Sequence, residues 1–530
     1  MSIAVSSPQP VLIAGKWRPA SSASDFAATD PNHNTPLEPR FPVSQWSDVD
    51  EALDAAAAAF EEMRKLPPEQ IAKFLEDYAD RIDANKDALV DAAFAETGLA
   101  KSPRLADVEL PRTSNQLRAA AAAARSGDWS LPTIDTTTGI RSVYRPLGPV
   151  AVFGPNNFPF AFGSVSGGDF AAAIAAGNPV IGKANSSHPE TTRRFAELAA
   201  QSIEATGLPP ATVQLLYRTS HADGERLVAD PRIGATGYTG GRAPGLKLKA
   251  AADAAGKPIY LELSSVNPVV FTEASLRERG DEIAGEYVTS VLMGTGQFCT
   301  NPGLVFVPDG QAGDSFVAAI QTKFADAPAG TLLSPGVLKG LKSGIQTLVD
   351  TGAKCLVGGD GEQSDRCAMA NTLLTVDGEA FLRDPEGFQS EAFGNAALVV
   401  RTKNAEQTCR CLSLLEGNLT GCVYSSKSGD DDLEAREFMF ALEPRVGRLL
   451  NDKMPTGVAV SAAMNHGGPY PATGHPGFTA VGVPGSLLRF AKLTSFDNVR
   501  QDRLPEILRD PPHAAAWRRI DGAWSQAAVG

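Results

Sequence analysis

The 530-residue chain is too long for one ordinary hydrophobic core, so two or more domains are expected. Its apolar (43%) and charged (21%) fractions are typical of a soluble globular protein, and it contains no apolar run long enough to predict a membrane span. The net charge of −13 disfavours nucleic acids and anionic membranes as partners, although a pocket for an anionic small molecule could still be locally basic.

The N-terminal part is predicted to be mainly helical after a start rich in proline, serine and asparagine. Ser47 and Asp50 resemble a capping box at the start of a helix. Apolar residues then recur at helical spacing, and Gly127 follows the last of these stripes. The pattern predicts helices over residues 52–60, 71–82, 89–94 and 106–125.

Residues 131–144 change in character, because threonine and β-branched residues flank Gly139. This composition predicts two extended strands joined in a hairpin. Such a hairpin could form a contact between subunits, and a plain surface hairpin explains it equally well.

From Gly148 onwards, short apolar runs alternate with helical segments. Strands are predicted at 148–154, 178–184, 213–217, 233–238 and 258–264, and helices at 171–176, 189–206, 222–229 and 245–255. This alternation predicts a parallel sheet with helices on both faces, which binds ligands at the carboxyl ends of its strands. The residues that follow the strands, Asn157, Lys183, Gly237 and Glu262 among them, are therefore candidates for a site.

A second α/β block is expected from about Asn267. It contains predicted strands at 304–307 and 396–400 and predicted helices at 315–324, 341–351 and 431–442. The polar tail after Pro505 is expected to be extended or loosely helical.

The loop at 294–302 presents Cys299 between glycines and a proline. A thiolate is an effective nucleophile toward a carbonyl carbon, whereas an isolated cysteine is more often an inert core residue. Asn157 could hold an oxyanion or form a turn, and Glu262 could be a general base or a surface carboxylate at a strand end. Lys183 could bond ribose hydroxyls or be simply solvated.

Six motifs in a fixed order change this balance. They are FGPNNFPF with Asn157, GKANSSHP with Lys183, ATGYTGG with Gly237, LELSSVNP with Glu262, GQFCTNPG with Cys299, and SEAFG with Glu391 and Phe393. Together they strongly resemble the aldehyde dehydrogenase superfamily from about Val43 to Asn498. The resemblance implies an α/β fold with two Rossmann-type parallel-sheet domains and a small oligomerisation hairpin. The implied units are a cofactor-binding domain at 1–130 and 145–266, the hairpin at 131–144, a catalytic domain at 267–465, and a C-terminal return and oligomerisation segment at 466–530.

The same resemblance implies oxidation of an aldehyde to an acid with NADP or NAD. In this scheme Cys299 attacks the carbonyl carbon, Asn157 and the Cys299 backbone N–H hold the oxyanion, and Glu262 activates the water that hydrolyses a thioester. Lys183 and Glu391 position ribose hydroxyls, and Phe393 packs near the nicotinamide. The implied walls of the substrate pocket are Phe158, Gln297, Phe298, Thr300 and Asn301.

Two positions depart from the usual pattern of the family and bear on the cofactor. Ser186 stands where many NAD-preferring members carry glutamate, so NADP is expected to be accepted and NAD also used. Tyr238 stands where a small hydroxyl residue is usual, after Gly237, which changes the expected pyrophosphate contact.

Variant motifs, including NHGGPYPAT at 465–473, resemble a branch that contains ketoglutarate semialdehyde (2,5-dioxovalerate) dehydrogenases and a related long-chain aldehyde dehydrogenase. A substrate with a carboxylate calls for a basic or hydroxyl-rich pocket. Arg112, Arg118 and Arg125 lie on one predicted helix, and each could face a substrate tunnel or form a surface ion pair. His466 could approach the pocket mouth or be structural.

Other readings of the fold are an enzyme that transfers the acyl group to coenzyme A and a catalytically idle binding protein. The presence of both Glu262 and Cys299 argues against them. The expected partners are a small-molecule aldehyde and further copies of the chain, as a homodimer or homotetramer. No metal site is expected, because Cys409 and Cys411 lack a third ligand nearby. Sparse cysteines and the absence of a signal-peptide pattern at the start predict a cytoplasmic protein.

Overall fold

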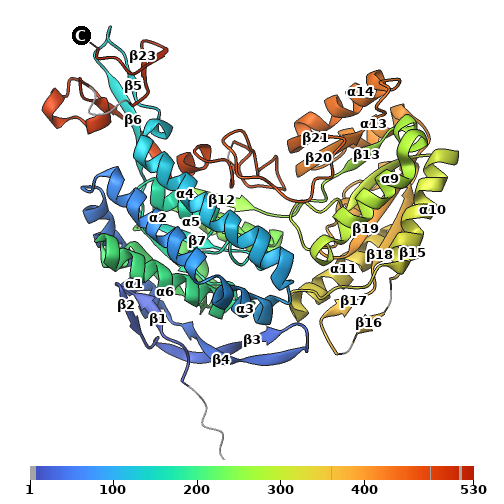
Figure 1. Cartoon of the computed structure of the whole chain (residues 1–530), viewed down its shortest axis with the longest axis horizontal. Coiled ribbons are helices and arrows are strands. Elements are labelled where there is room, and N and C mark those ends of the chain that lie inside the picture. Colours follow the sequence, from blue (N-terminus) through green and yellow to red (C-terminus); the bar gives the residue numbers. More distant parts are fainter. Residues whose placement is uncertain (1–6, 360, 364, 478, 512–515, 530) are drawn as a thin grey trace, which may run out of the picture.

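Two seven-stranded sheets form the centres of two lobes, and a five-stranded sheet projects from the first lobe (Figure 1). The computed structural model describes residues 7–359, 361–363, 365–477, 479–511 and 516–529. Residues 1–6 and 530, at the ends of two predicted units, lie outside this range. Among the helices described, none is long and apolar enough to cross a membrane.

The first sheet confirms the predicted alternation of strands and helices. Its strands, in spatial order, are β12 (Ile259–Glu262), β11 (Ala235–Thr239), β7 (Val150–Phe153), β8 (Val180–Lys183), β9 (Val213–Leu216), β1 (Val11–Ile13) and β2 (Lys16–Arg18). The first five are parallel, and β1 joins β9 antiparallel. Strands β7 and β9 are buried along their whole length, as expected where helices cover both faces. The N-terminal pair β1 and β2 was not predicted.

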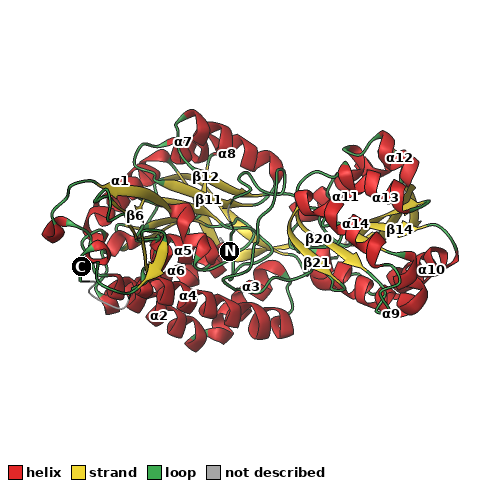
Figure 2. Cartoon of the chain, turned by 90° about the horizontal axis from the view of Figure 1, so that it is seen from above, coloured by secondary structure: helices red, strands yellow, loops and turns green. Residues whose placement is uncertain are grey.

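Eight α-helices surround this sheet. They are α1 (Trp46–Met63), α2 (Pro68–Ala84), α3 (Lys86–Thr97), α4 (Leu110–Ser126), α5 (Gly168–Ala175), α6 (Pro189–Thr206), α7 (His221–Ala229) and α8 (Arg242–Ala254). In Figure 2, α7 and α8 lie above β11 and β12, and α2 and α4 lie below them. Helix α5 packs on β7 and β8, and α2 and α4 pack against α5.

Two helix starts differ from the prediction. Gln45 is the N-cap of α1 and makes no side-chain capping bond, so the predicted capping box at Ser47 and Asp50 is wrong. The helix begins at Trp46, whose ring packs under the guanidinium of Arg226 at 3.5 Å. Helix α4 begins at Leu110, after a π-helical segment η1 (Lys101–Glu109) that the sequence pattern did not separate from it.

The second lobe is built on another largely parallel sheet. Its strands, in spatial order, are β15 (Lys354–Val357), β18 (Thr372–Asp377), β19 (Ala396–Thr402), β14 (Leu304–Pro308), β13 (Val269–Phe271), β20 (Asn418–Tyr424) and β21 (Val446–Asn451). Its helices are α9 (Glu273–Leu292), α10 (Gln311–Asp326), α11 (Pro335–Thr351), α12 (Gly378–Arg383), α13 (Ala405–Ser413) and α14 (Asp432–Leu442). A small ribbon is formed by β16 (Glu362–Gln363) and β17 (Ala368–Met369).

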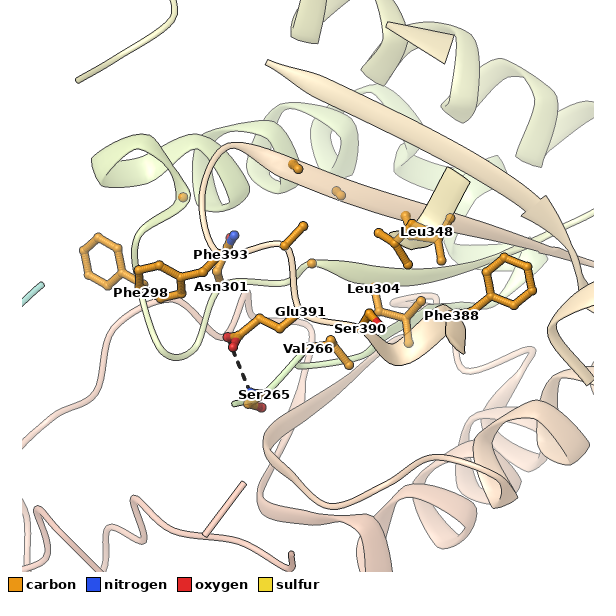
Figure 3. A pocket seen from close by; sticks show the side chains of 16 residues that line it. Ser265, Val266, Phe298, Asn301, Leu304, Leu348, Phe388, Ser390, Glu391 and Phe393 are labelled. Atoms are coloured by element: carbon orange, nitrogen blue, oxygen red, sulfur yellow. Dashed lines mark hydrogen bonds between the residues drawn. The ribbon is translucent and has the colours of Figure 1, made fainter. Parts of the chain in front are cut away.

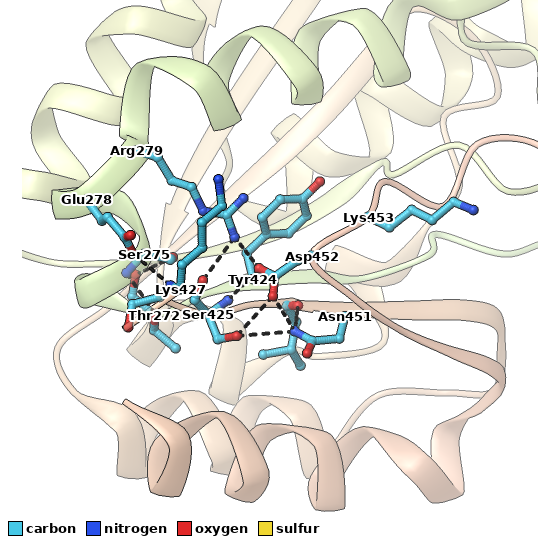
Figure 4. A network of polar contacts seen from close by, with 12 residues as sticks. Thr272, Ser275, Glu278, Arg279, Tyr424, Ser425, Lys427, Asn451, Asp452 and Lys453 are labelled. Atoms are coloured by element: carbon cyan, nitrogen blue, oxygen red, sulfur yellow. Dashed lines mark hydrogen bonds and ion pairs between the residues drawn. The ribbon is translucent and has the colours of Figure 1, made fainter. Parts of the chain in front are cut away.

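A polar network at the end of β21 fixes the start of the loop that follows (Figure 4). Asp452 accepts hydrogen bonds from the backbone N–H of Ser425 at 3.0 Å and from Asn451 at 3.0 Å, and it pairs with Arg279. Arg448 then donates to the carbonyls of Pro455 and Gly457 at 2.6 and 3.0 Å. The loop from 452 to 457 is therefore held against the second sheet before it reaches the space between the lobes.

The projecting sheet confirms the hairpin and shows how the extended part of the tail is paired. Its strands, in spatial order, are β22 (Ala491–Phe496), β6 (Arg141–Pro146), β5 (Thr133–Ile134), β23 (Arg518–Ile520) and β24 (Ala523–Ser525). The tail thus forms strands, with β23 parallel to β5. Arg518 is fully buried and donates to the carbonyls of Arg509 and Ala527, which fixes the tail in place.

A long hairpin connects the lobes on the side opposite the five-stranded sheet (Figure 1). It consists of β3 (Ser22–Asp30) and β4 (Thr35–Ser44), joined to β10 (Arg218–Thr219). The carbonyl of Pro31 at its tip accepts a hydrogen bond from Cys367 of the second lobe. Short helical turns complete the chain at η2 (Asp128–Ser130), η3 (Pro210–Thr212), η4 (Met293–Gly296), η5 (Gly387–Gln389), η6 (Glu443–Arg445), η7 (Gly485–Phe490), η8 (Gln501–Arg503) and η9 (Glu506–Leu508).

Candidate active site

Three side chains from distant parts of the chain meet between the lobes. Nε2 of His466 lies 2.9 Å from Oε1 of Glu262 and 3.5 Å from Sγ of Cys299. Glu262 ends β12 of the first sheet, and Cys299 follows η4 in the second lobe. His466 belongs to the long segment between β21 and β22. A thiol, an imidazole and a carboxylate in contact can move a proton from sulfur to a base.

The backbone around Glu262 is fixed by the segment that carries His466. Leu263 donates to the carbonyl of Ala472 at 2.8 Å, and Glu262 forms an isolated antiparallel bridge with Thr473. The backbone N–H of His466 donates to Oγ1 of Thr479 at 2.9 Å. Both side chains are almost completely buried, at 3% and 2% exposure. Their contact is therefore set by a pairing of two backbone segments.

The Cys299 loop is shaped by backbone contacts on both sides. Asn267 donates to the carbonyls of Cys299 and Asn301 at 2.8 and 2.9 Å. Gln297 donates to the carbonyl of Gly294 at 3.0 Å and accepts from the Leu333 N–H at 2.8 Å. A Cβ on residue 296 would lie 2.0 Å from the Gly394 carbonyl oxygen, so only glycine fits there.

The surroundings of Cys299 raise the pKa of its thiol. Burial raises the pKa of Cys299 well above its ordinary value, and the negative charge of Glu262 raises it further. The positive charges of Arg112 and Arg448 act in the opposite direction. Since the thiolate is the reactive form, the neighbouring imidazole and carboxylate have to take the proton before Cys299 can attack.

Asn157 lies beside the Cys299 loop, as the motif order predicted. The side-chain Nδ2 of Asn157 donates to the backbone carbonyl of Gln297 at 3.0 Å. The backbone carbonyl of Asn157 accepts from Arg104 at 2.9 Å. Arg104 also pairs with Glu109, which accepts from the backbone N–H groups of Phe160 and Ala161. The backbone of Asn157 is thus held by the Arg104–Glu109 ion pair, and its side-chain amide is held by a carbonyl of the reactive loop.

A cavity of about 1030 Å³ opens between α4, the Cys299 loop and the loop that ends at Val460. Phe158 and Phe298, two of the predicted pocket residues, line it, with their rings edge to face at 5.3 Å. The guanidinium of Arg104 stacks over the Phe158 ring at 4.2 Å. The cavity therefore has an aromatic wall with positive charge beside it.

The three arginines of α4 have different surroundings in the structure. Arg118 pairs with Asp80 and Asp83, and Arg125 pairs with Glu69 and Glu76, so both form ion pairs on the surface. Arg112 instead lines the cavity, with its guanidinium 5.0 Å from the centre of the Phe162 ring.

The guanidinium of Arg112 is incompletely paired. Its Nε and Nη2 are shielded from solvent and have no hydrogen-bond partner within the described part of the chain. Burial lowers the pKa of Arg112, and the negative charges of Glu109, Cys299 and Glu262 oppose this change. Shielded, unpaired donors beside a cavity are costly unless a ligand accepts from them.

The other three predicted pocket residues lie within or behind the reactive loop. Gln297 bonds to backbone groups, and Oγ1 of Thr300 accepts from the Gly457 N–H at 3.2 Å. Asn301 donates to the carbonyl of Gly394 at 3.3 Å and faces Phe393 (Figure 3). None of the three is among the residues that line the large cavity, so their role as walls of the pocket stays a prediction.

The predicted cofactor residues lie at two places along the space between the lobes. Lys183 ends β8, where burial lowers the pKa of its amine to about 8. Ser186 follows in a loop that Asn185 ties to the carbonyl of Gly154 at 3.2 Å. Glu391 points towards Ser265, whose N–H donates to it at 3.4 Å, with Phe393 beyond (Figure 3). Burial raises the pKa of Glu391 to about 7.

Gly237 and Tyr238 have packing roles in the structure. A Cβ on residue 237 would lie 2.6 Å from Oδ2 of Asp169, which pairs with Arg489. The Tyr238 hydroxyl donates to the carbonyl of Gly241 at 3.0 Å, at the start of α8. Contact of either residue with a dinucleotide stays a prediction.

The residues present fit a dinucleotide. A hollow of about 270 Å³ beside Glu391 is lined by Ser264, Ser265 and Arg242 at the N-terminus of α8. A carboxylate and serine groups suit ribose hydroxyls, and a helix N-terminus with an arginine suits a pyrophosphate.

His466 and Arg112 are the site residues that sequence reasoning left undecided. A signal for His466 was present in the glycine- and proline-rich motif at 465–473, which predicts a fixed loop. The signal for Arg112 was its position one residue after Pro111, near the start of a helix. Neither pattern shows in which direction the side chain points.

Comparison with known proteins agrees with this geometry. Residues 17–467 match the model of the aldehyde dehydrogenase family. The chain belongs to the aldehyde dehydrogenase family. It is accordingly an NAD(P)-dependent aldehyde dehydrogenase.

The sequence is 39% identical to alpha-ketoglutaric semialdehyde dehydrogenase 2 of Azospirillum brasilense, over 96% of this chain and 98% of that protein. It is 35% identical to the alpha-ketoglutaric semialdehyde dehydrogenase of Acinetobacter baylyi, over 96% and 97%. The fold is similar to that of aldehyde dehydrogenase C from Pseudomonas syringae, solved as a variant with NAD⁺ and octanal. That match has a TM-score of 0.78 at 20% identity, over 93% of this chain and 97% of that chain.

Proposed function

We propose that this aldehyde dehydrogenase oxidises a short semialdehyde that carries a carboxylate, with 2,5-dioxovalerate as substrate and 2-oxoglutarate as product. The single observation that carries the substrate class is the incompletely paired guanidinium of Arg112 on the cavity wall. The two relatives named for alpha-ketoglutaric semialdehyde support the choice within that class.

In the first step, the Cys299 thiol gives its proton to the His466–Glu262 pair, and the thiolate sulfur attacks the aldehyde carbon. A new C–S bond forms, and the carbonyl π electrons move to oxygen. Asn157 and the backbone N–H of Cys299 are the donors assigned to this oxyanion. Donors that are already oriented need no costly rearrangement during the reaction, and the contacts that hold Asn157 provide this orientation.

NAD(P)⁺, when bound, supplies the hydride acceptor, and the residues assigned to hold it are Lys183, Ser186, Gly237, Tyr238, Glu391 and Phe393. As the hydrogen leaves the adduct carbon with the C–H electron pair, a lone pair of the oxyanion re-forms the C=O bond, which gives a thioester on Cys299. After the proton taken from the thiol has passed from the His466–Glu262 pair to solvent, Glu262 takes a proton from water, which attacks the thioester carbon. The C–S bond breaks, the acid is released, and the proton held by Glu262 returns to the sulfur to restore the thiol.

Binding of the carboxylate end is assigned to Arg112. An arginine that is shielded from solvent recognises a carboxylate through two parallel hydrogen bonds, and these bonds are stronger than neutral ones. The aromatic surfaces of Phe158 and Phe298 supply the contact for the carbon chain between the two ends of the substrate.

The test is an aldehyde panel with both cofactors. The panel contains 2,5-dioxovalerate, succinic semialdehyde, glycolaldehyde and a long aliphatic aldehyde, with and without coenzyme A. We expect the highest kcat/KM for 2,5-dioxovalerate and a free acid as product in every case. A preference for the long aliphatic aldehyde would overturn the substrate, and an acyl-coenzyme A product would overturn the assignment of water as the acyl acceptor.

The proposal extends to domains and assembly. Cofactor binding is assigned to 1–130 and 145–266, catalysis to 267–465, and oligomerisation to the 131–144 hairpin with the 466–530 segment. The support is that β5, β6, β22, β23 and β24 share one sheet, on which Leu493, Trp517 and Trp524 are exposed. Exposed apolar side chains gathered on one small sheet favour a homodimer or homotetramer. Light scattering of a variant lacking 516–530 tests it.

A further inference from the structure

The reactive cluster has the composition of a zinc site as well as that of a catalytic triad. Within the described residues, Glu262, Cys299 and His466 are the one group of three such side chains whose ligand atoms all lie within 4.8 Å of one another. Thiolate, imidazole and carboxylate are the ligands that zinc takes in proteins, and three protein ligands with one open position are typical of non-structural sites. We propose that Zn²⁺ binds reversibly to this cluster and switches the enzyme off.

The positions of the ligand atoms fit one ion with little movement. The separations of 3.5 Å between Sγ and Nε2 and 2.9 Å between Nε2 and Oε1 are close to the edges of a tetrahedron round zinc. Oε2 of Glu262 is buried and has no hydrogen-bond partner among the residues described. One carboxylate oxygen is therefore available to the ion, and the bond between Nε2 and Oε1 is replaced by the bond from Nε2 to zinc.

The surroundings select which cation enters. Arg112 and Arg448 act electrostatically on Cys299, so their positive charges oppose any ion that is held by charge alone. Mg²⁺ and Ca²⁺ require several oxygen ligands, and the cluster offers one carboxylate. Zinc gains from the sulfur and nitrogen bonds, and its preference for them is independent of the arginines.

Binding is an exchange of a proton for a metal ion, without a redox step. The S–H bond of Cys299 breaks, the proton goes to solvent, and a Zn–S bond forms. The sulfur lone pair that would attack an aldehyde is then shared with zinc, and Glu262 is no longer free to act as a base. Inhibition follows for every aldehyde, so the inference rests on the site and is independent of which semialdehyde is the substrate.

Direct binding to the full chain tests this proposal without turnover. A Cys355→Ser background removes an exposed thiol. We expect one Zn²⁺ per chain in competition with a chromophoric chelator, and X-ray absorption with one sulfur at about 2.3 Å and nitrogen or oxygen at about 2.0–2.1 Å. Millimolar Mg²⁺ should not compete.

The matched variants are His466→Phe and His475→Phe. The first should weaken Zn²⁺ binding by more than the roughly 10- to 100-fold that loss of an outer partner costs in zinc sites. The second should leave binding unchanged. Equal affinity in both variants, or an absorption spectrum without sulfur, would overturn the proposal. Because affinity is measured without substrate, a failure here is distinct from a failure of the aldehyde panel.

Discussion

His466 and Glu262 lie 204 positions apart in the chain, and their Nε2 and Oε1 atoms are 2.9 Å apart in the structure. The same Nε2 is 3.5 Å from the sulfur of Cys299. The imidazole therefore lies between nucleophile and base, so that it can receive the thiol proton directly. A general base at this place connects the attack and hydrolysis steps of the proposed reaction.

Replacing His466 by phenylalanine removes this connection and keeps an aromatic ring against Phe162. We expect kcat to fall by about 10²- to 10⁴-fold, the usual contribution of a positioned acid–base group. Single-turnover kinetics should show that acyl-enzyme formation is slowed. His475→Phe is the control and should keep wild-type kcat. Normal turnover in His466→Phe would show that the imidazole has no part in the chemistry.

The rate of Cys299 alkylation should still be rising at pH 9, because burial and Glu262 raise the thiol pKa. Only the thiolate reacts, so a raised pKa moves the curve of alkylation rate against pH to higher pH. Glu262→Gln removes a negative charge and should move this curve to lower pH. Arg112→Leu removes a positive charge and should move the curve to still higher pH. Mass spectrometry of iodoacetamide-labelled peptides measures the rates. A plateau below pH 8 in the wild type would contradict this prediction.

Arg112→Leu should raise KM for 2,5-dioxovalerate by about 10- to 100-fold, since a hydrogen-bonded charge pair is worth about 1.5–3 kcal/mol. KM for hexanal, which has no carboxylate, should stay the same or fall. Arg118→Leu, on the same helix, breaks only exposed ion pairs with Asp80 and Asp83, each worth about 0–1 kcal/mol. An equal rise of KM for both aldehydes in Arg112→Leu would indicate a disturbed pocket and no specific contact with the carboxylate.

Ser186→Glu should weaken the binding of NADP⁺ by about tenfold or more, which corresponds to about 1.4 kcal/mol, because a carboxylate would repel the 2′-phosphate. NAD⁺ affinity should stay the same or improve, since the carboxylate can accept from a ribose hydroxyl. Ser187→Glu places the same charge at the next residue and is the control. Fluorescence titration with both nucleotides gives the two dissociation constants. An unchanged NADP⁺/NAD⁺ ratio in Ser186→Glu would remove Ser186 from cofactor selection.

Five strands of the first sheet could be predicted because they are short, apolar and separated by helices with 3.6-residue periodicity, whereas only β14 and β19 of the second sheet were predicted. Helix α6, for example, was predicted with the bounds that it has. The strands β23 and β24 could not be found, since each has only three residues, which is too short to show an apolar alternation. They form because β23 pairs with the edge of β5 and because the buried Arg518 donates to the carbonyls of Arg509 and Ala527, and both contacts are tertiary.

Some residues of the site could be predicted from local sequence patterns, and others depend on tertiary contacts. Cys299, Asn157 and Glu262 were placed correctly near one another because each follows a strand or sits in a motif of fixed order. Arg112 and Arg118 could not be told apart, because periodicity gives spacing along a helix and not which neighbours it meets. His466 was undecided because its partner Glu262 lies 204 positions away in the chain.

Asn267 connects the reactive Cys299 loop to the sheet of the second lobe. Its side chain holds the carbonyl of Cys299, and its backbone N–H donates to Asn418 of β20 at 3.1 Å. Cys299 thus moves with the second sheet, while Glu262 moves with the first. The distance between the sulfur and the carboxylate is therefore fixed by the placement of one sheet relative to the other, and catalytic competence is a property of both sheets together.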